Sequence, residues 1–297
     1  MKNHYIIDAH CHIYPEKIAQ KATDSTDKFY GVTHAPFHGT TKELIEQSEA
    51  SGVSKMLVQS VATTEKQVSS INHFIANEVK KYPDKFIGFG TLHPNSDDLE
   101  RDVKELISLG LKGVKLHPDI QNFKIDDYRC LKIYELCEKH HLPILMHTGD
   151  DRYDNSNPNR LLPVMEIYTD LTVIGAHFGG YSIWEEASEK LCKLPNLYVD
   201  TCSAFFALEK ETALKIIRRY GADKVIFATD YPMWRQKDEL DYILSLGLTD
   251  EELEKIFSVN ILKIVESWKF KVESFGTLRV DFSDSQSRNQ NKKHPII

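Results

Sequence analysis

Short apolar runs, each followed by a stretch with helical periodicity, recur along most of this chain. The runs are nearly continuous in apolar residues, a pattern typical of strands that are buried on both faces of a parallel sheet. We expect strands at 5–12, 55–59, 86–90, 113–118, 143–147, 171–176, 196–199 and 224–228. The stretches between them carry apolar residues three and four positions apart on a polar background, which predicts amphipathic helices.

The alternation of strand and helix through eight units favours a closed (β/α)8 barrel, the TIM barrel, over an open doubly wound sheet. Two more helices are expected to close this body, one over about 237–246 and one that begins at Thr249, where Thr249 and Glu252 form a capping-box pattern. We therefore expect one domain over 1–268. The remainder, 269–297, is expected to be a polar tail, partly disordered, with a small hairpin at its start.

The segment 13–39 is long for a connection between a strand and a helix in a barrel. It contains two prolines, two glycines and several aromatic residues. We expect a long loop here, which is either a lid over the mouth of the barrel or a surface excursion packed by its own aromatic side chains.

Side chains that commonly bind metals stand at the ends of several of these runs. His10 and His12 end the first strand and, being two positions apart, point to the same face. His147, His177 and Asp230 end three later strands, and the carboxyl ends of all strands meet at one rim of a barrel. Imidazole nitrogens and a carboxylate oxygen suit zinc or a similar divalent ion. A metal site that activates water is therefore expected at this rim.

Composition and charge narrow the function. The chain has 297 residues, 41% of them hydrophobic, and a net charge of −7 with no basic face evident, which argues against a general nucleic-acid binder. Its five cysteines are scattered and contain no C-x-x-C pair, as expected for reduced thiols in a cytoplasmic protein. No stretch approaches the roughly 18 apolar residues of a membrane span, and no signal region or nucleotide-binding glycine motif is evident.

The order of these motifs resembles the amidohydrolase superfamily of metal-dependent barrels. Within it, the chain is most similar to the amidohydrolase-related group, which includes aminocarboxymuconate-semialdehyde decarboxylase and related decarboxylases and hydrolases. The similarity covers roughly 5–265, and the motifs that carry it are DAHCH at 8–12, GVKLHP at 113–118, ILMH at 144–147, GAHFGG at 175–180 and TDYP at 229–232. The His-x-His start is common to the superfamily, whereas the HFGG and TDYP motifs are more particular to this group.

The resemblance implies a set of metal ligands. His10, His12, His147 and Asp230 would bind one divalent metal ion per chain, with zinc expected and manganese as the alternative. His177 would stand beside a metal-bound water as an acid, a base or an electrostatic group, and Asp230 would take the proton of that water in a hydrolytic cycle. The residues alone leave open which of these side chains are ligands and which is the base.

Lys115 and His117, which end the fourth strand on one face, have two interpretations. Binuclear members of the superfamily carry a carboxylated lysine near the position of Lys115, where it bridges two metals. The group that this chain resembles most binds one metal, so both residues are expected to line the pocket and contact the substrate instead.

The decarboxylases of that group hold a substrate carboxylate with an arginine early in the chain, but the first arginine here is Arg101. Arg235, on the loop after the last strand, either makes this contact with the substrate or is a solvated surface arginine. Arg152 and Arg160, on the loop after the fifth strand, are further candidates.

Two catalytic functions and one non-catalytic function remain open. The leading hypothesis is a metal-dependent hydrolase that acts on an amide, ester or lactone bond of a small molecule. The alternative is a nonoxidative decarboxylase, a carboxy-lyase of a small carboxylic acid, and the fold does not choose between the two. A binding protein without catalysis is least favoured, because the full ligand set is present. By analogy we also expect a homodimer, with no nucleic-acid or membrane partner.

Overall fold

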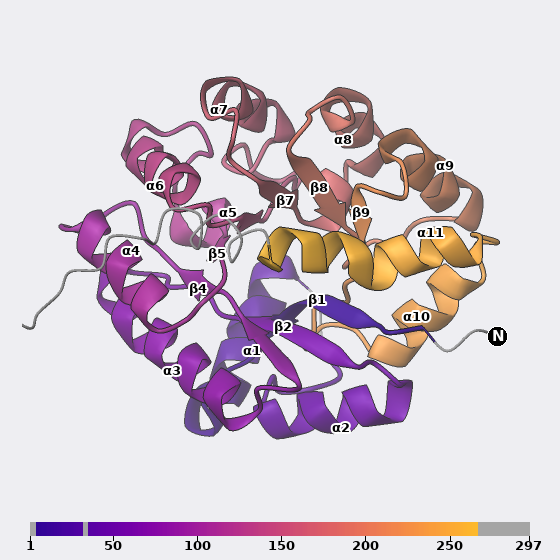
Figure 1. Cartoon of the computed structure of the whole chain (residues 1–297), viewed down its shortest axis with the longest axis horizontal. Helices are drawn as coiled ribbons and strands as arrows, with labels where there is room; N and C mark the ends of the chain where they lie inside the picture. Colours follow the sequence, from indigo (N-terminus) through magenta and orange to yellow (C-terminus); the bar gives the residue numbers. More distant parts are fainter. Residues whose placement is uncertain (1–3, 32–34, 267–297) are drawn as a thin grey trace, which may run out of the picture.

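The computed structural model describes residues 4–31 and 35–266, and its centre is a ring of parallel strands (Figure 1). The strand segments are β1 (Ile7–His12), β2 (Lys55–Gln59), β3 (Phe86–Gly88), β4 (Gly90–Thr91), β5 (Val114–Leu116), β6 (Ile144–Met146), β7 (Val173–Gly175), β8 (Leu197–Asp200) and β9 (Val225–Ile226). Because β3 and β4 are two parts of one strand interrupted at Phe89, these segments correspond to the strands expected from the sequence.

Hydrogen bonds join the ends of the sheet into a closed barrel. The strands pair in the order β1–β2–β3 and β4 to β9, and the pairs are parallel. The ring closes where β1 meets β9 and the segment after it: the N–H of Ala9 donates to the Phe227 carbonyl at 3.0 Å, and the N–H of His12 donates to the Tyr231 carbonyl at 2.7 Å. The predicted (β/α)8 barrel is thereby confirmed.

A ring of helices covers the outside of the barrel, as Figure 1 shows. The longer helices are α2 (Thr41–Ser51), α3 (Val68–Lys81), α4 (Leu99–Ser108), α6 (Tyr128–Lys139), α7 (Leu161–Ile167), α8 (Trp184–Leu191), α9 (Lys210–Tyr220) and α10 (Gln236–Leu244). Shorter turns are η1 (Glu65–Gln67), α5 (Pro118–Gln121), η2 (Pro158–Arg160) and η3 (His177–Gly179). Buried side chains such as Val58, Leu116 and Met146 fill the layer between strands and helices. This layer fixes the strands, whose carboxyl ends carry the polar residues.

The last described helix closes the amino-terminal end of the barrel. α11 (Asp250–Glu254) continues through a π-helical turn, Lys255–Val259, and helical backbone to residue 266. Ile261 and Ile264 pack with the apolar side chains inside the barrel, including Ile7, and Figure 1 shows this helix lying across the strands. Ile7 is the first residue of β1, so this helix lies at the amino-terminal ends of the strands. The carboxyl-terminal ends of the strands stay open for a functional site.

The prediction of a long loop at 13–39 is wrong, because most of this segment is helical. α1 (Glu16–Tyr30) spans 15 residues and ends at Gly31, whose φ of 69° is the left-handed conformation of a helix C-cap. The buried residues of α1 are Ala19 and Thr23, one small and one polar. Its few apolar residues, such as Ile18, Ala22 and Phe29, do have helical spacing, so the prolines and glycines around the segment, and not a missing periodicity, made it resemble a loop.

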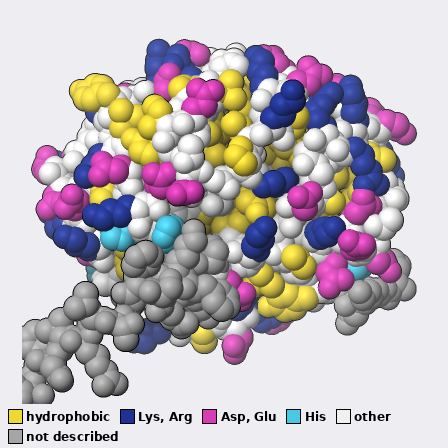
Figure 2. Space-filling view, turned by 45° about the horizontal axis from the view of Figure 1, so that its top comes forward, with side chains coloured by type: hydrophobic (Ala, Val, Ile, Leu, Met, Phe, Trp, Pro, Cys, Tyr) yellow, Lys and Arg dark blue, Asp and Glu magenta, His cyan; other side chains and the backbone are white. Residues whose placement is uncertain are grey.

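Charged side chains of both signs are interspersed on the face seen in Figure 2, where no continuous basic surface is visible. Within residues 4–31 and 35–266, no helix is both long enough and apolar enough to cross a membrane. The polar tail and hairpin expected at 269–297 lie outside the described residues.

Candidate metal centre

Three of the predicted metal ligands converge at the carboxyl ends of β1 and β9. Nε2 of His10 and Nε2 of His12 are 3.1 Å apart, and Oδ1 of Asp230 lies 3.3 Å from the first and 3.6 Å from the second. Ligand atoms bonded tetrahedrally to a divalent ion at about 2.0–2.1 Å would be about 3.3 Å apart. The three atoms thus fit one face of a metal coordination sphere, and we call His10, His12 and Asp230 the ligand triad.

A bulge in β1 places both histidines on the inner face of the barrel. Between Asp8 and Cys11 the pairing with β2 shifts by one residue, so that Ala9 and His10 together stand opposite a single residue of β2. The extra residue removes Asp8 from the face that His10 and His12 share, although strict alternation would place it there. The Asp8 carboxylate instead accepts hydrogen bonds from the start of the β9–α10 loop and from α10.

Asp200, at the end of β8, fixes the tautomer of His10. Its Oδ2 lies 2.8 Å from Nδ1 of His10, and its Oδ1 accepts the backbone N–H of His177 at 2.8 Å. Burial acts to raise the pKa of Asp200, but the neighbouring His10 holds it below its ordinary value. An ionised carboxylate only accepts, so Nδ1 of His10 carries the proton and Nε2 keeps a lone pair for the metal. The sequence analysis missed Asp200, although it ends an apolar run just as Asp230 follows one.

Asp230 is held in an unusual backbone conformation with both of its oxygens engaged. Its φ of 63° is one that residues other than glycine rarely adopt. Oδ1 faces the triad histidines, and Oδ2 accepts a hydrogen bond from Oγ of Ser203 at 2.7 Å. Burial acts to raise the pKa of Asp230, but His10, His177 and His12 hold it well below its ordinary value. The side chain is therefore an anion, as a metal ligand must be.

His147, the fourth predicted ligand, lies next to the triad rather than within it. Nδ1 of His177 donates to the Cys202 carbonyl at 3.0 Å, so Nε2 of His177 accepts from Nδ1 of His147 at 2.9 Å. Nε2 of His147 then keeps a lone pair, and it is buried with no hydrogen-bond partner in the described part of the chain. Burial lowers the pKa of both histidines, which keeps the rings neutral. The potential ligand atoms of His147, His117 and Asp119 lie within 4.8 Å of one another and form a group separate from the triad.

The pair formed by His117 and His147 is a poor second metal site. Their rings are stacked, with centroids 3.9 Å apart and planes inclined by 8°. Imidazole lone pairs lie in the ring plane, so two parallel rings do not direct them at one point. Nδ1 of His117 accepts the N–H of Ile120, which leaves Nε2 to donate to the hydroxyl of Tyr30 at 2.9 Å. His117 therefore belongs to the wall of the site, as the sequence analysis expects.

Lys115 places a cationic side chain directly beside the triad. Its Nζ lies 3.2 Å from Nε2 of His10, and the side chain is buried. Burial lowers the pKa of Lys115. A buried amino group in this position is suited to an anionic substrate group that also meets the metal.

A cavity of about 880 Å³ opens onto the triad. Helices α1 and α3 contribute much of its wall. Its apolar and aromatic lining includes Ile18, Phe29, Tyr30, Ile71 and Phe74, and its lysines are Lys17, Lys21 and Lys115. Asp119 also lines the cavity, and burial raises its pKa to about 6. The lining combines aromatic surface with positive charge.

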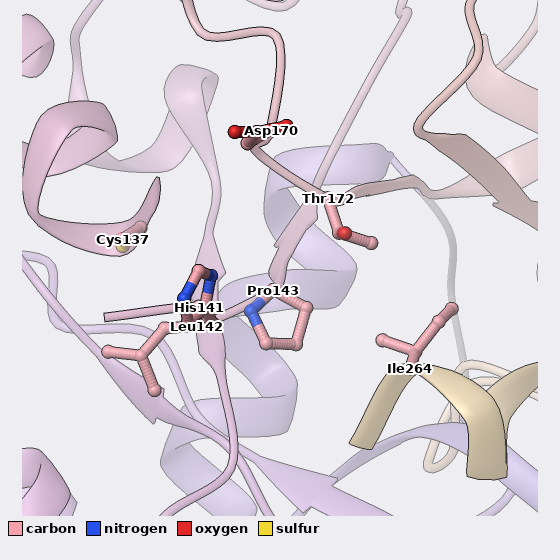
Figure 3. Close-up of a pocket in the computed structure, with 7 residues that line it drawn as sticks. All are labelled: Cys137, His141, Leu142, Pro143, Asp170, Thr172 and Ile264. Carbon is pink, nitrogen blue, oxygen red and sulfur yellow. The ribbon is translucent and has the colours of Figure 1, made fainter. Parts of the chain in front are cut away.

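A second cavity lies at the other end of the barrel and is much smaller. Its volume is about 30 Å³, roughly that of one water molecule. Figure 3 shows the residues around it, from Cys137 near the end of α6 to Pro143 before β6 and Ile264 of the last helix. It has no room for a substrate.

The three candidate arginines lie outside the described lining of the large cavity. Arg235 is exposed, and its guanidinium lies over the ring of Phe37, 5.1 Å from the centroid. Arg152 pairs with both oxygens of Asp150, at 2.8 and 2.6 Å. Arg160 pairs with aspartates on neighbouring loops. A contact between Arg235 and a substrate stays a prediction that this position does not favour.

The amidohydrolase family pattern matches residues 7–266, and the chain belongs to this family. Its barrel, its His-x-His strand and the carboxylate at the end of the last strand agree with that assignment, which makes the chain a metal-dependent enzyme of the amidohydrolase superfamily.

A curated relative with a named activity is a decarboxylase. The 2-amino-3-carboxymuconate-6-semialdehyde decarboxylase of Dictyostelium discoideum is 26% identical over an alignment of 200 residues, and the match covers 54% of this chain and 55% of that protein. The match thus spans about half the length of this relative.

Two solved structures share the fold. An uncharacterised TIM-barrel protein from Bordetella bronchiseptica has a TM-score of 0.74 and 22% identity, covering 89% of this chain and 99% of that one. The 5-carboxyvanillate decarboxylase of Novosphingobium aromaticivorans, complexed with manganese and 4-hydroxy-3-methoxy-5-nitrobenzoic acid, has a TM-score of 0.69 and 18% identity, covering 89% and 96%. At these identities the likeness shows the fold alone.

Proposed function

We propose that this chain is a metal-dependent nonoxidative decarboxylase that removes the carboxylate of a small, planar, unsaturated acid. The hydrolase that the sequence analysis places first is supported less well, because the reported relatives with a named activity are decarboxylases. The observation that carries the proposal is the ligand triad beside the buried amino group of Lys115, at the base of an aromatic-lined cavity.

The charge of the cavity supports an acidic substrate. The whole chain carries a net charge of −7, yet Lys17, Lys21 and Lys115 line this cavity, while its acidic lining residues are Asp119 and Asp230. A divalent ion would balance the negative charge of Asp230, and burial favours the neutral form of Asp119. The described lining therefore attracts anions, even though the protein as a whole repels them.

In the proposed reaction, the bond between the carboxylate carbon and the substrate carbon breaks. Carbon dioxide leaves, and the electron pair of that bond stays on the substrate carbon until this carbon takes up one proton. A divalent ion at the triad would supply a Lewis acid that holds and polarises the oxygens of the substrate. Neither an oxidant nor a water molecule is consumed.

The side chains around the triad divide the remaining work. Lys115 binds an anionic oxygen of the substrate, and the hydroxyl of Tyr30, fixed by His117, orients the planar group. Nε2 of His147, whose ring is oriented by His177 across 2.9 Å, would take up a proton from solvent and deliver it to the substrate carbon, after which the ring is neutral again.

Hydrolysis would need a base next to the triad. The expected base, Asp230, already accepts a hydrogen bond from Ser203 on Oδ2, and its Oδ1 faces the triad histidines. Both oxygens are thus engaged before a water molecule could give up a proton, which supports decarboxylation over hydrolysis.

We propose one divalent ion per chain and name zinc and manganese as the metals to test. Two imidazoles and a carboxylate suit zinc, which the sequence analysis puts first. The Novosphingobium aromaticivorans decarboxylase, by contrast, is complexed with manganese. Elemental analysis of the purified chain decides between them.

Isotope labels distinguish the two reactions. The chain, loaded with manganese or zinc, is given 2-amino-3-carboxymuconate-6-semialdehyde or 5-carboxyvanillate in deuterated water that carries oxygen-18. The proposal predicts release of carbon dioxide, one deuteron on the product carbon and, for 5-carboxyvanillate, whose product has no aldehyde oxygen to exchange with water, no oxygen-18 in the organic product. His12→Ala should abolish the reaction, and His73→Ala, at an exposed position, should not. Hydrolysis of a lactone or ester probe with incorporation of oxygen-18, and no release of carbon dioxide from either acid, would restore the hydrolase hypothesis.

A further inference from the structure

We propose that Ser203 and Trp234 are positioning residues that hold the Asp230 carboxylate in the orientation required to bind the metal. This inference rests on the proposed metal-dependent function of the ligand triad. It extends the site to two residues that lie outside the triad, on the loops after β8 and β9.

A continuous hydrogen-bond relay connects the three residues. Oδ1 of Asp230 faces the triad histidines, and its Oδ2 accepts from Oγ of Ser203 at 2.7 Å. Oγ of Ser203 in turn accepts from Nε1 of Trp234 at 2.8 Å. Oδ1 is thus available to bind the metal, while the hydrogen bond from Ser203 fixes Oδ2.

The chemistry of the indole gives the relay one direction. An indole N–H donates and has no lone pair to offer, so Ser203 must accept from Trp234. The hydroxyl proton of Ser203 is then free to point at Oδ2 of Asp230, and this is the acceptor found for it among the described residues. The relay therefore fixes the plane of the carboxylate as well as its distance from the histidines.

The backbone at both acceptors is shaped for this arrangement. Ser203 has a φ of 47° and Asp230 a φ of 63°, both in the left-handed region. Non-glycine residues persist there where the surrounding structure holds them, and such positions gather at functional sites. Two neighbouring strand ends thus turn their side chains toward each other across the rim of the barrel.

An aromatic stack at the rim holds the indole in place. The ring of Phe206 lies parallel to that of Trp234, with centroids 4.8 Å apart and planes inclined by 10°, and Phe206 is 51% exposed. Trp184 meets the edge of Phe206 at 6.3 Å. Trp184 makes no such relay: its Nε1 is buried without a hydrogen-bond partner in the described structure. It is therefore a matched control for Trp234.

The relay predicts a graded loss of metal affinity. We would measure the dissociation constants of zinc and manganese for the full chain by competition with a chromogenic chelator. Ser203→Ala should weaken binding by about 10- to 100-fold, the usual effect of removing a partner that orients a metal ligand. Trp234→Phe, which keeps the stack and removes the N–H, should weaken it by less, whereas Trp184→Phe should stay within about twofold of wild type.

A double variant tests whether Trp234 acts through Ser203. If it does, Ser203→Ala with Trp234→Phe binds metal no more weakly than Ser203→Ala alone, because contacts in one network are not additive. Ser203→Gly provides a second way to remove the hydroxyl, since glycine tolerates the φ of this position and preserves folding.

The outcomes separate this inference from the proposed function. A wild-type chain that binds metal, with Ser203→Ala, Ser203→Gly and Trp234→Phe all within twofold of it, overturns the positioning role and leaves the metal site intact. A loss in Trp234→Phe that is equally large when Ser203 is already alanine also overturns the relay. A wild-type chain that binds neither metal contradicts the proposed function itself, and the positioning role with it.

Discussion

His10 shows how single neighbours decide the chemistry of this site. Its Nδ1 faces Asp200 and its Nε2 faces the other members of the triad and Lys115. The carboxylate therefore selects the tautomer that leaves Nε2 free for a metal, and the same logic runs through His177 to His147. Each of these nitrogens has its role because of one hydrogen bond at the far side of the ring.

Replacing Asp200 with Asn should weaken metal binding by about 10- to 100-fold. The amide offers one acceptor where the carboxylate has two, so either Nδ1 of His10 or the N–H of His177 loses its partner. Chelator competition measures the effect, with the exposed Asp223→Asn as the control. An affinity equal to that of the wild type would show that the tautomer of His10 does not depend on Asp200.

Asp119 should make the metal-free protein less stable as the pH rises. Burial raises its pKa from 3.8 to about 6. Between these values the unfolded chain loses the proton more readily than the folded one, so stability falls through this window and the full penalty applies above about pH 6. Asp119→Asn removes this penalty, because an amide does not ionise. The amide oxygen can still accept the hydrogen bond that the hydroxyl of Ser156 donates to Asp119.

Asp119→Asn should therefore be more stable than the wild type by about 1–2 kcal/mol at pH 7.5, a value that allows for partial screening by water. At pH 4 the two proteins should differ little. Urea unfolding of chelator-treated protein at both pH values measures this. An equal difference at both would show that Asp119 does not titrate in this window.

At the scale of elements, helix α1 is the part of the wall that covers the site from outside. It supplies Tyr30, which meets His117, and one arginine from the loop after β6 secures its end. Nη1 of Arg152 donates to the Phe29 carbonyl at 2.9 Å, and the guanidinium lies 5.4 Å from the ring centroids of Phe29 and Tyr30. Arg152 thus anchors the wall rather than the substrate.

Arg152→Ala should loosen α1. We expect the amides near the carboxyl end of α1 to exchange with deuterium about tenfold faster, which corresponds to a local loss of about 1.4 kcal/mol. Arg160→Ala removes a pair with Asp126 on the same side of the barrel and should leave α1 unchanged. Unaltered exchange in Arg152→Ala would mean that the packing of Ala19 and Thr23 alone holds the helix.

At the scale of the whole molecule, stability and chemistry lie at opposite ends of the barrel. The helix that continues to residue 266 fills the amino-terminal end with apolar side chains, and the triad lies at the carboxyl-terminal end. The expected homodimer and cytoplasmic location stay predictions.

This separation predicts that Ile261→Ala lowers the free energy of unfolding by about 2–4 kcal/mol, as loss of a buried aliphatic side chain usually does. Metal affinity should not change. Urea unfolding and chelator competition on one preparation test both statements, with the exposed Lys263→Ala as the control at less than about 0.5 kcal/mol. A large loss of metal affinity in Ile261→Ala would refute the separation.

The sequence predicts the fold better than it predicts the site. The strands could be located because each is a dense apolar run. The helix at 16–30 was missed because it has few apolar residues and lies in a segment with two prolines and two glycines. His10, His12 and Asp230 could be placed at one rim because they end strands. The bulge beside Asp8 left no trace in the pattern, since it depends on the hydrogen-bond register between two strands.

Contacts between side chains that are distant in the sequence could not be predicted from the sequence. Arg235 is a candidate for a substrate contact in the sequence, but in the fold its guanidinium lies over the ring of Phe37, and the side chain is exposed outside the lining of the large cavity. The relay from Trp234 to Ser203 likewise joins two loops that are 31 positions apart. Neither contact has a local pattern, because both depend on which strand ends become neighbours in the barrel.

The metal content of the chain tests the central claim most directly. Protein purified without chelator is analysed by elemental mass spectrometry, as wild type and as His12→Ala. We predict about one zinc or manganese ion per wild-type chain and its loss in the variant, because His12 is one of the three ligands that converge. About two ions per chain would instead make Lys115 a bridging ligand, and no metal in either protein would contradict a metal-dependent site at the triad.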